Sequence, residues 1–241
     1  NLIRASIDLP ESAHARAARL IETLTAAGVS KYNVGSTTLP NVPDSSQSPR
    51  ILVPGQVEND ASLQFGGGDV RTNLGLLQAA RAANPDATIL FKPHPDVEAG
   101  LRPGAVPNAS DWADHVLAGT DPIAAIRAVD SVWTMTSLLG FEALLHGRTV
   151  HCLGHPFYAG WGLTQDVARH PRRTPGPTLT GLVHAALIDY PRYFAPHTGR
   201  PCPPEFVADH LARGATNTQG YGLRTLAKVQ GVFASYAHLW R

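Results

Sequence analysis

The stretch Ala87-Thr88-Ile89-Leu90-Phe91-Lys92-Pro93-His94-Pro95-Asp96 decides the fold class that we expect for this chain. Its first five residues are typical of a buried strand, and the two prolines that follow fix φ and prevent a helical continuation. Lys92 and His94 therefore lie just beyond the carboxyl end of a strand, where open α/β sheets bind their ligands. A cation and an imidazole at that place suit an anionic ligand such as a phosphate. The alternative is a stiff turn in which His94 only caps a neighbouring segment.

An alternation of strands and helices extends to both sides of this stretch. We expect further strands at residues 51–54, 115–118, 130–134 and 149–153, and helices at residues 72–83, 122–128 and 138–145. In the helix at 72–83, we expect Leu74, Leu77 and Ala80 to face the sheet. Apolar strands that alternate with helices predict a parallel sheet covered on both faces, which is an α/β fold of the Rossmann type.

The regions that flank this sheet are predicted to be mostly helical. A helix at 11–27 is marked by Pro10 at its entrance and Gly28 at its exit. Further helices are expected at residues 179–188, 205–212 and 223–239. We therefore predict three parts, which are a helix and linker at 1–49, a Rossmann-like domain at 50–165 and a C-terminal helical extension at 166–241.

Composition limits the class of protein. The chain has 241 residues, of which 43% are hydrophobic and 16% charged, so it can bury a sizeable core, and its net charge of +1 gives no polybasic field for nucleic acid. Two distant cysteines indicate a reducing compartment. No apolar run is long enough to span a bilayer, so we expect a cytoplasmic protein that is able to work at a membrane surface. The opening at Asn1, without a methionine, predicts a fragment of something longer.

An acidic segment, Gln56-Val57-Glu58-Asn59-Asp60, directly follows the first expected strand. If this segment is extended, Glu58 and Asp60 face the same way and present paired carboxylates. Such a pair serves as nucleophile or base and as acid when the two environments separate the pKa values. The alternative is a solvated acidic loop that caps the next helix.

Hydroxyl residues follow the fourth expected strand, in the run Thr134-Met135-Thr136-Ser137. Hydroxyls and free backbone N–H groups at the start of a helix form an anion site. The alternative is simple N-capping by Thr136 or Ser137, and both roles are compatible. Glu142 lies inside the helix that follows, where it would accept hydrogen bonds from a ribose or stand exposed on the helix surface.

Two more segments follow strands of the same sheet. Gly66-Gly67-Gly68 allows a close approach of the backbone to a ligand, but it lacks the spacing of a dinucleotide fingerprint or a P-loop. The aromatic run at 155–162 suits a loop that packs on a sugar or, as we prefer, one whose Phe157 and Trp161 hold the C-terminal helices. Because all these clusters fall on one edge of one sheet, they predict a nucleotide- or phosphate-binding domain.

Four of these segments, at 56–62, 92–97, 134–145 and 156–164, resemble in order and spacing the capsule polysaccharide biosynthesis proteins of the KpsC/LipB type. Residues 30–33 resemble that family's interdomain stretch. The resemblance implies a GT-B glycosyltransferase that transfers Kdo, a 3-deoxy-octulosonic acid, from CMP-Kdo to a lipid-linked acceptor with retention. Only about fifty residues precede the first strand, so the chain resembles the C-terminal, donor-binding half of such an enzyme.

The resemblance also implies roles for single residues. Asp60 matches the candidate nucleophile, Glu58 would support it or shuttle a proton, and His94 would assist departure of the nucleotide. The residues assigned to the nucleotide are Lys92, His94, Pro95, Thr134, Thr136, Ser137 and Glu142. The motif of most relatives reads Glu-Asp-Asp, whereas Asn59 stands in the middle here, which removes that position as a catalyst. No metal or other cofactor is expected, since a CMP-sugar has a single phosphate to neutralise.

Other functions are compatible with the same residues. One alternative is another CMP-sugar transferase, such as a sialyltransferase, and a second is a non-catalytic module that binds nucleotide or capsule lipid. The expected partners are the nucleotide-sugar donor and the lipid-linked glycan acceptor, with peripheral association with the inner membrane and capsule assembly proteins. Nucleic acid is not expected.

Overall fold

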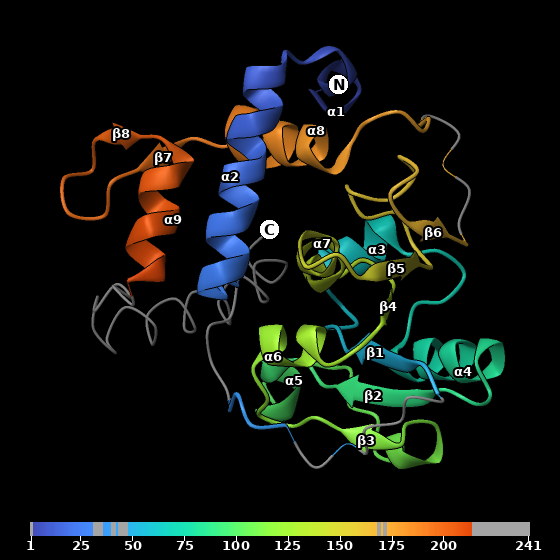
Figure 1. Cartoon of the computed structure of the whole chain (residues 1–241). Helices are drawn as coiled ribbons and strands as arrows, with labels where there is room; N and C mark the ends of the chain where they lie inside the picture. Colours follow the sequence, from blue (N-terminus) through green and yellow to red (C-terminus); the bar gives the residue numbers. More distant parts are fainter. Residues whose placement is uncertain are drawn as a thin grey trace, which may run out of the picture. The chain divides into compact units, whose positions relative to one another are not determined.

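The structure, a computed structural model, describes residues 2–30, 36–39, 42, 48–167, 170 and 173–213. The chain forms two compact units, Asn1–Pro191 and Arg192–Arg241. The first unit contains a six-stranded parallel sheet in the order β3-β2-β1-β4-β5-β6, flanked by helices (Figure 1). The predicted α/β fold of the Rossmann type is therefore confirmed.

The six strands are short; the first five follow the predicted order, and the sixth, at residues 165–166, was not predicted. Their bounds are Arg50–Pro54 (β1), Thr88–Lys92 (β2), His115–Val116 (β3), Ser131–Thr134 (β4), Thr149–Cys152 (β5) and Gln165–Asp166 (β6). From β1 the chain moves to β2 and β3, then returns to place β4 on the other side of β1, where Ile51 is paired with both Ile89 and Ser131. Ligands of such sheets bind beyond the carboxyl ends of the strands at this change of direction.

Helices connect the strands of the first unit and extend it on the amino-terminal side. The α-helices are Leu2–Ala5 (α1), Glu11–Ala27 (α2), Ala61–Gly66 (α3), Asn73–Ala83 (α4), Pro95–Glu98 (α5), Pro122–Arg127 (α6), Leu138–Leu145 (α7) and Leu179–Val183 (α8). A π-helix at His184–Asp189 continues α8, and α2 packs against both. The bounds of α2 and α7 are those predicted from the sequence.

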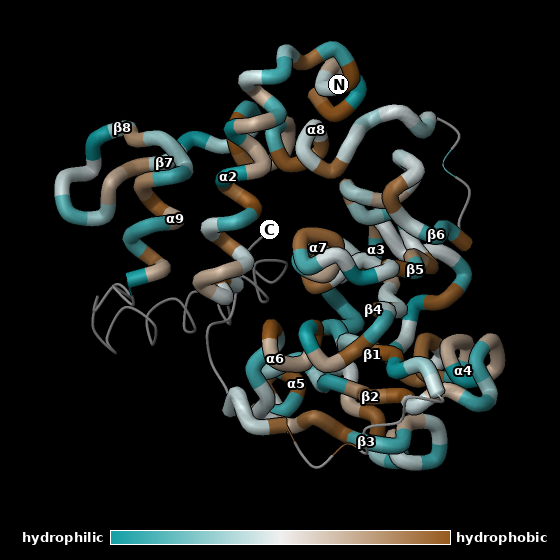
Figure 2. Tube along the Cα trace, viewed as in Figure 1, coloured by the Kyte–Doolittle hydropathy of each residue, from teal (hydrophilic) through white to brown (hydrophobic). Residues whose placement is uncertain are grey.

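One face of the sheet is covered by α4. Leu76, Leu77 and Ala80 are fully buried there, in a core shared with Ile51 and Phe91, and hydrophobic residues are concentrated in the central strands (Figure 2). The prediction that Leu74 faces the sheet is wrong, because its side chain is 41% exposed. The row at 73, 76, 77 and 80, which follows the helical period, forms the buried face instead.

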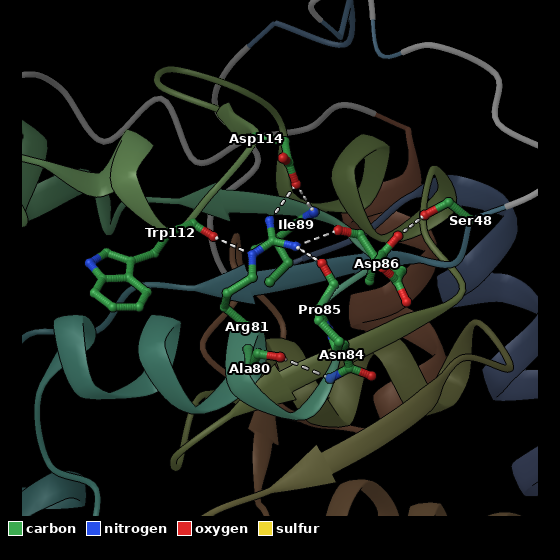
Figure 3. A network of polar contacts seen from close by, with 10 residues as sticks. Ser48, Ala80, Arg81, Asn84, Pro85, Asp86, Ile89, Trp112 and Asp114 are labelled. Atoms are coloured by element: carbon green, nitrogen blue, oxygen red, sulfur yellow. Dashed lines mark hydrogen bonds and ion pairs between the residues drawn. The ribbon is translucent and has the colours of Figure 1, made fainter.

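The amino end of β2 is fixed by Arg81 at the end of α4 (Figure 3). Its guanidinium donates hydrogen bonds to the carbonyl oxygens of Pro85, Ala87 and Trp112, at 3.1, 2.7 and 3.1 Å. It also pairs with Asp114, whose carboxylate accepts a further bond from the backbone N–H of Ile89 at 2.7 Å. This network ties a helix and two strands together at the edge of the sheet opposite to the predicted site.

The second unit contains β7 (Tyr193–Phe194) and β8 (Pro201–Cys202), which pair antiparallel, and α9 (Pro204–Ala212), which contacts β7. The region after residue 165 therefore contains strands besides the expected helices. The helix expected at 223–239 lies outside the described residues, as do residues 31–33 of the stretch that resembles an interdomain segment. Within the described part of the chain, no helix combines the length and the apolar character that crossing a membrane requires.

Candidate functional site

A cavity of about 270 Å³ opens at the carboxyl edge of the sheet, beyond the ends of β1, β2 and β4. Its lining comes from the segment after β1, the proline-rich loop after β2 and the start of α7. The predicted site residues that line it are Asp60, Lys92, His94, Pro95, Thr136 and Ser137. The structure thus brings together, in one cavity, side chains that lie up to 77 positions apart in the sequence.

Lys92 supplies the buried cation of this cavity. It is the last residue of β2 and only 5% exposed, yet it belongs to the cavity lining. Burial lowers the pKa of its ammonium, while the charges of Glu98 and Asp121 act in the opposite direction. An ammonium in such a place gains from an anionic ligand, which would offset the cost of its lost hydration.

His94 has two roles in the structure. It is the N-cap of α5, and its Nδ1 accepts a hydrogen bond from the backbone N–H of Asp96 at 3.1 Å, so the neutral ring carries its proton on Nε2. The same residue lines the cavity beside Pro95, which occupies the first turn of α5. The structure therefore shows the cap, and it also places His94 in the cavity lining.

The hydroxyl segment also combines capping with access to the cavity. Ser137 caps α7 and accepts a bond from the N–H of Leu139 at 3.2 Å, and both Thr136 and Ser137 line the cavity. Thr134 is fully buried and outside the lining, where its hydroxyl accepts a bond from the N–H of Ser137 at 3.1 Å. Thr134 therefore stabilises this turn without reaching the cavity.

Gln56 is a site residue that the sequence reasoning did not single out. Its buried side chain donates to the hydroxyl of Thr136 at 2.8 Å and accepts from the N–H of Thr136 at 2.9 Å. Its backbone N–H donates to the side chain of the buried Asn73 at 2.8 Å, and its carbonyl accepts a bond from the same side chain. Gln56 thus joins the ends of β1 and β4 and the start of α4. An amide directly after a strand was the only signal for it in the sequence.

The two carboxylates do not face the same way, so that expectation is wrong. Residues 58–60 form a turn rather than an extended segment. Asp60 caps α3, accepting a bond from the N–H of Ser62 at 2.8 Å, and it lines the cavity. Glu58 lies outside the lining and accepts a bond from the N–H of Asn73 at the start of α4, at 2.7 Å. Each acid thus binds the start of a helix, which agrees with the alternative of a capping loop. Of the two, only Asp60 lines the cavity.

Comparison with known proteins assigns the chain to a family. The family described as capsule polysaccharide biosynthesis protein matches residues 7–193. The chain belongs to this family. It is 45% identical over 199 residues to the capsule polysaccharide modification protein LipA of Neisseria meningitidis serogroup B, covering 82% of this chain and 28% of that protein. It is 44% identical over 182 residues to the lipopolysaccharide-processing protein LpsZ of Rhizobium meliloti, covering 74% and 41%.

Two solved structures share the fold of this family member. The KpsC beta Kdo 2,7 transferase of Thermosulfurimonas dismutans has a TM-score of 0.75 and 35% identity, covering 89% of this chain and 65% of that one. The KpsC beta Kdo 2,4 transferase of the same organism has a TM-score of 0.73 and 33% identity, covering 85% and 64%. The chain therefore spans less than a third of LipA and just under two thirds of either KpsC structure.

Glu142 is buried in this family member, not exposed on the helix surface. Its side chain is 8% exposed inside α7 and lies outside the cavity lining. It is one of the charges near the buried Tyr158, whose pKa is raised chiefly by burial and further by Cys152, Asp166 and Glu142. Tyr158 in turn donates a hydrogen bond to the carbonyl of Ser137. The contact of Glu142 with a ribose stays a prediction.

The glycine run packs against the protein itself. A Cβ on Gly68 would lie 2.2 Å from the carbonyl oxygen of Leu153, and the carbonyl of Gly66 accepts a bond from the N–H of His155 at 2.6 Å. The close approach to Leu153 leaves no room for a Cβ at Gly68.

A second cavity, of about 370 Å³, adjoins the first and shares Ser62, Thr136 and Leu138 with it. Part of the aromatic segment lines it, including Phe157, which is 40% exposed. Trp161 of the same segment is buried and donates to the carbonyl of Phe157 at 2.8 Å. The segment therefore combines a packed ring with an accessible one. Among the residues that the structure describes, no group of three His, Cys, Asp or Glu side chains is placed to hold a metal ion.

Proposed function

We propose that this chain is the donor-binding part of a capsule glycosyltransferase that transfers Kdo from CMP-Kdo to a lipid-linked acceptor with retention. The observation that carries the proposal is the single cavity that holds Lys92, His94, the start of α7 and Asp60, at the change of strand direction. The likeness to two Kdo transferases supports the choice of sugar. A lipid-linked acceptor would bring the enzyme to the inner membrane surface and to capsule assembly proteins.

The cations of the cavity are suited to the leaving group. CMP departs as a phosphate monoester dianion, so charge develops on the phosphate as the glycosidic bond breaks. The ammonium of Lys92, the Nε2–H of His94 and the N-terminus of α7 at Ser137 would stabilise that charge. Removal of one such donor typically costs on the order of 3 kcal/mol of transition-state stabilisation.

Asp60 is the proposed nucleophile. Its carboxylate would attack the anomeric carbon while the bond from that carbon to the phosphate oxygen breaks and CMP leaves with the electron pair. A hydroxyl of the acceptor would then displace Asp60 and lose its proton to solvent, so that two inversions give net retention. Glu58, bound to the start of α4, would support the turn that presents Asp60.

Calorimetry of CMP binding to the chain tests the first part of this proposal. We expect wild type to bind CMP, and His94→Ala and Lys92→Met each to weaken binding by about tenfold or more, since each removes a charged or polar donor. His197→Ala, which removes an exposed imidazole from the second unit, is the matched control and should leave binding unchanged. Wild type that does not bind CMP, or variants that bind as well as wild type, would contradict the proposal.

Donor competition separates the related activities. The chain is first loaded with labelled CMP. Unlabelled CMP-Kdo or CMP-sialic acid is then added in separate titrations. We expect CMP-Kdo to displace CMP at lower concentration than CMP-sialic acid does, because the chain is similar to Kdo transferases. The reverse order would favour a sialyltransferase.

A further inference from the structure

A second cation lines the donor cavity and has no role in the mechanism so far. Arg102 follows α5, and its guanidinium Nη2 donates a hydrogen bond to the side-chain oxygen of Asn59 at 2.8 Å. The backbone N–H of Arg102 donates to the carbonyl of Asp96 at 3.2 Å, so the residue is also anchored to the loop of His94. Arg102 is thus fixed at two points, one of them the residue that precedes Asp60.

The partner of Arg102 leaves its charge available. Asn59 is neutral, so its amide oxygen orients the guanidinium without cancelling its charge. Among the residues that the structure describes, no carboxylate forms a salt bridge with Arg102. A guanidinium has five N–H donors in a planar fork, and one bond to Asn59 leaves donors that suit a carboxylate in a bidentate arrangement.

The chemistry of the proposed donor supplies such a carboxylate at a defined place. The single phosphate of a CMP-sugar is assigned to Lys92 and His94, which leaves Arg102 for a second anion. A 2-ulosonic acid carries its carboxylate directly on the anomeric carbon, which is the atom that Asp60 would attack. The group that binds this carboxylate therefore has to lie beside the nucleophile, as Arg102 does through its bond to Asn59.

A guanidinium beside Asp60 also affects the repulsion between the nucleophile and the sugar carboxylate. A carboxylate nucleophile that approaches a carbon bearing another carboxylate experiences repulsion between two like charges. A guanidinium that contacts the sugar carboxylate offsets this repulsion. We propose that Arg102 binds the carboxylate of the donor sugar and that Asn59 is the positioning residue for it. This inference rests on the proposed function, and it makes Arg102 a determinant of specificity for acidic sugars.

Binding of two ligands, CMP and freshly prepared CMP-Kdo, tests the inference without an acceptor, in an Asp60→Asn background that cannot consume the donor. We expect Arg102→Gln to weaken CMP-Kdo about tenfold or more, because a charged hydrogen-bonded pair is lost, and to leave CMP within about twofold of the Asp60→Asn parent. Arg102→Lys keeps the charge but not the fork, so its loss for CMP-Kdo should be intermediate. Arg71→Gln is the control, since Arg71 is an exposed arginine outside the cavity that bonds the carbonyl of Gly68.

The outcomes separate this inference from the proposed function. Equal weakening of both ligands by Arg102→Gln would assign the residue to the phosphate and overturn the inference. The inference would also be overturned if Arg102→Gln left CMP-Kdo binding unchanged, or if Arg71→Gln weakened that binding to the same extent. Wild type that binds neither ligand would overturn the proposed function, and this inference with it.

Discussion

The side chain of Gln56 forms two hydrogen bonds with Thr136, one to the hydroxyl and one from the backbone N–H, across the ends of β1 and β4. Where the strand order reverses, the connections that follow two neighbouring strands lead away in opposite directions, so a crevice opens between the strand ends. A side chain that bridges them fixes the width of the crevice between them. Gln56 is itself held by Asn73 through its own backbone, so the bridge reaches the start of α4.

We expect Gln56→Ala to lower the free energy of unfolding by about 1–3 kcal/mol, because it removes the acceptor of the part-buried N–H of Thr136 and the donor to the Thr136 hydroxyl. Urea unfolding measures the change. Gln64→Ala is the matched control, since this exposed glutamine makes one bond to the carbonyl of Asn59, and its effect should be within about 0.5 kcal/mol. An equal loss in both variants would show that the bridge is not important for stability.

Much of the fold was predictable from the sequence because local signals agreed with the final packing. Helix α2 has Pro10 before it and Gly28, in the left-handed conformation at φ 62°, after it. The buried strands appear as short apolar runs, which a parallel sheet requires. The error at Leu74 arose because the buried row of this helix includes the polar Asn73, which hydropathy alone does not assign to the core.

The site was predictable to the extent that its residues follow strands. Parallel strands end at one edge, so residues placed after β1, β2 and β4 meet there regardless of their separation in sequence. The direction of Glu58 could not be predicted, because it depends on a turn whose shape is set by the contact with Asn73. Arg102 lies in a loop without periodicity, and only the fold brings it to Asn59.

We expect Arg81→Met to destabilise the chain by about 2–3 kcal/mol while leaving CMP binding unchanged. The substitution keeps the length of the side chain but removes bonds to three carbonyl groups and to Asp114, several of which are part-buried. The network lies at the edge of the sheet opposite to the cavity, so donor binding should not change. Urea unfolding and calorimetry measure the two effects.

Arg81→Lys should lose nearly as much stability, since an ammonium cannot reproduce the fork that contacts Pro85, Ala87 and Trp112. Arg71→Met, at an exposed arginine with a single bond to a carbonyl, is the control and should change stability by less than about 0.5 kcal/mol. Full stability of Arg81→Lys would show that charge, not geometry, is what matters there.

We expect stability to fall as the pH is lowered from about 7 to about 5. Burial lowers the pKa values of His146, His151 and His170, with nearby arginines adding to the effect at His146. The unfolded chain then binds more protons than the native chain once the pH falls below about 6.5, so the balance shifts towards unfolding. Urea unfolding at several pH values measures the slope.

A single variant tests the origin of this slope. His151 stacks on Trp133 with ring centroids 4.6 Å apart, so His151→Phe keeps an aromatic ring in contact while removing a titrating group. The difference in stability between pH 7 and pH 5 should be smaller in His151→Phe than in wild type. An unchanged or steeper slope would exclude His151 as a contributor.

We expect Asp60→Asn to abolish reaction with the donor and to leave CMP affinity equal to or higher than that of wild type. Asparagine keeps an oxygen that accepts the N–H of Ser62, so the cap of α3 and the fold are preserved. Loss of a negative charge from the lining reduces repulsion of the phosphate, so binding should not weaken. The proposed nucleophile, by contrast, is removed, because a neutral amide cannot form the glycosyl-enzyme bond.

Two readouts on the same protein decide the role of Asp60. Calorimetry gives the CMP affinity, and mass spectrometry of the chain incubated with CMP-Kdo detects a sugar adduct on the peptide that contains residue 60. Wild type should show the adduct together with released CMP, and Asp60→Asn should show neither above the rate of spontaneous hydrolysis. An adduct that persists in Asp60→Asn, or one found on Glu58, would assign the nucleophile to another residue.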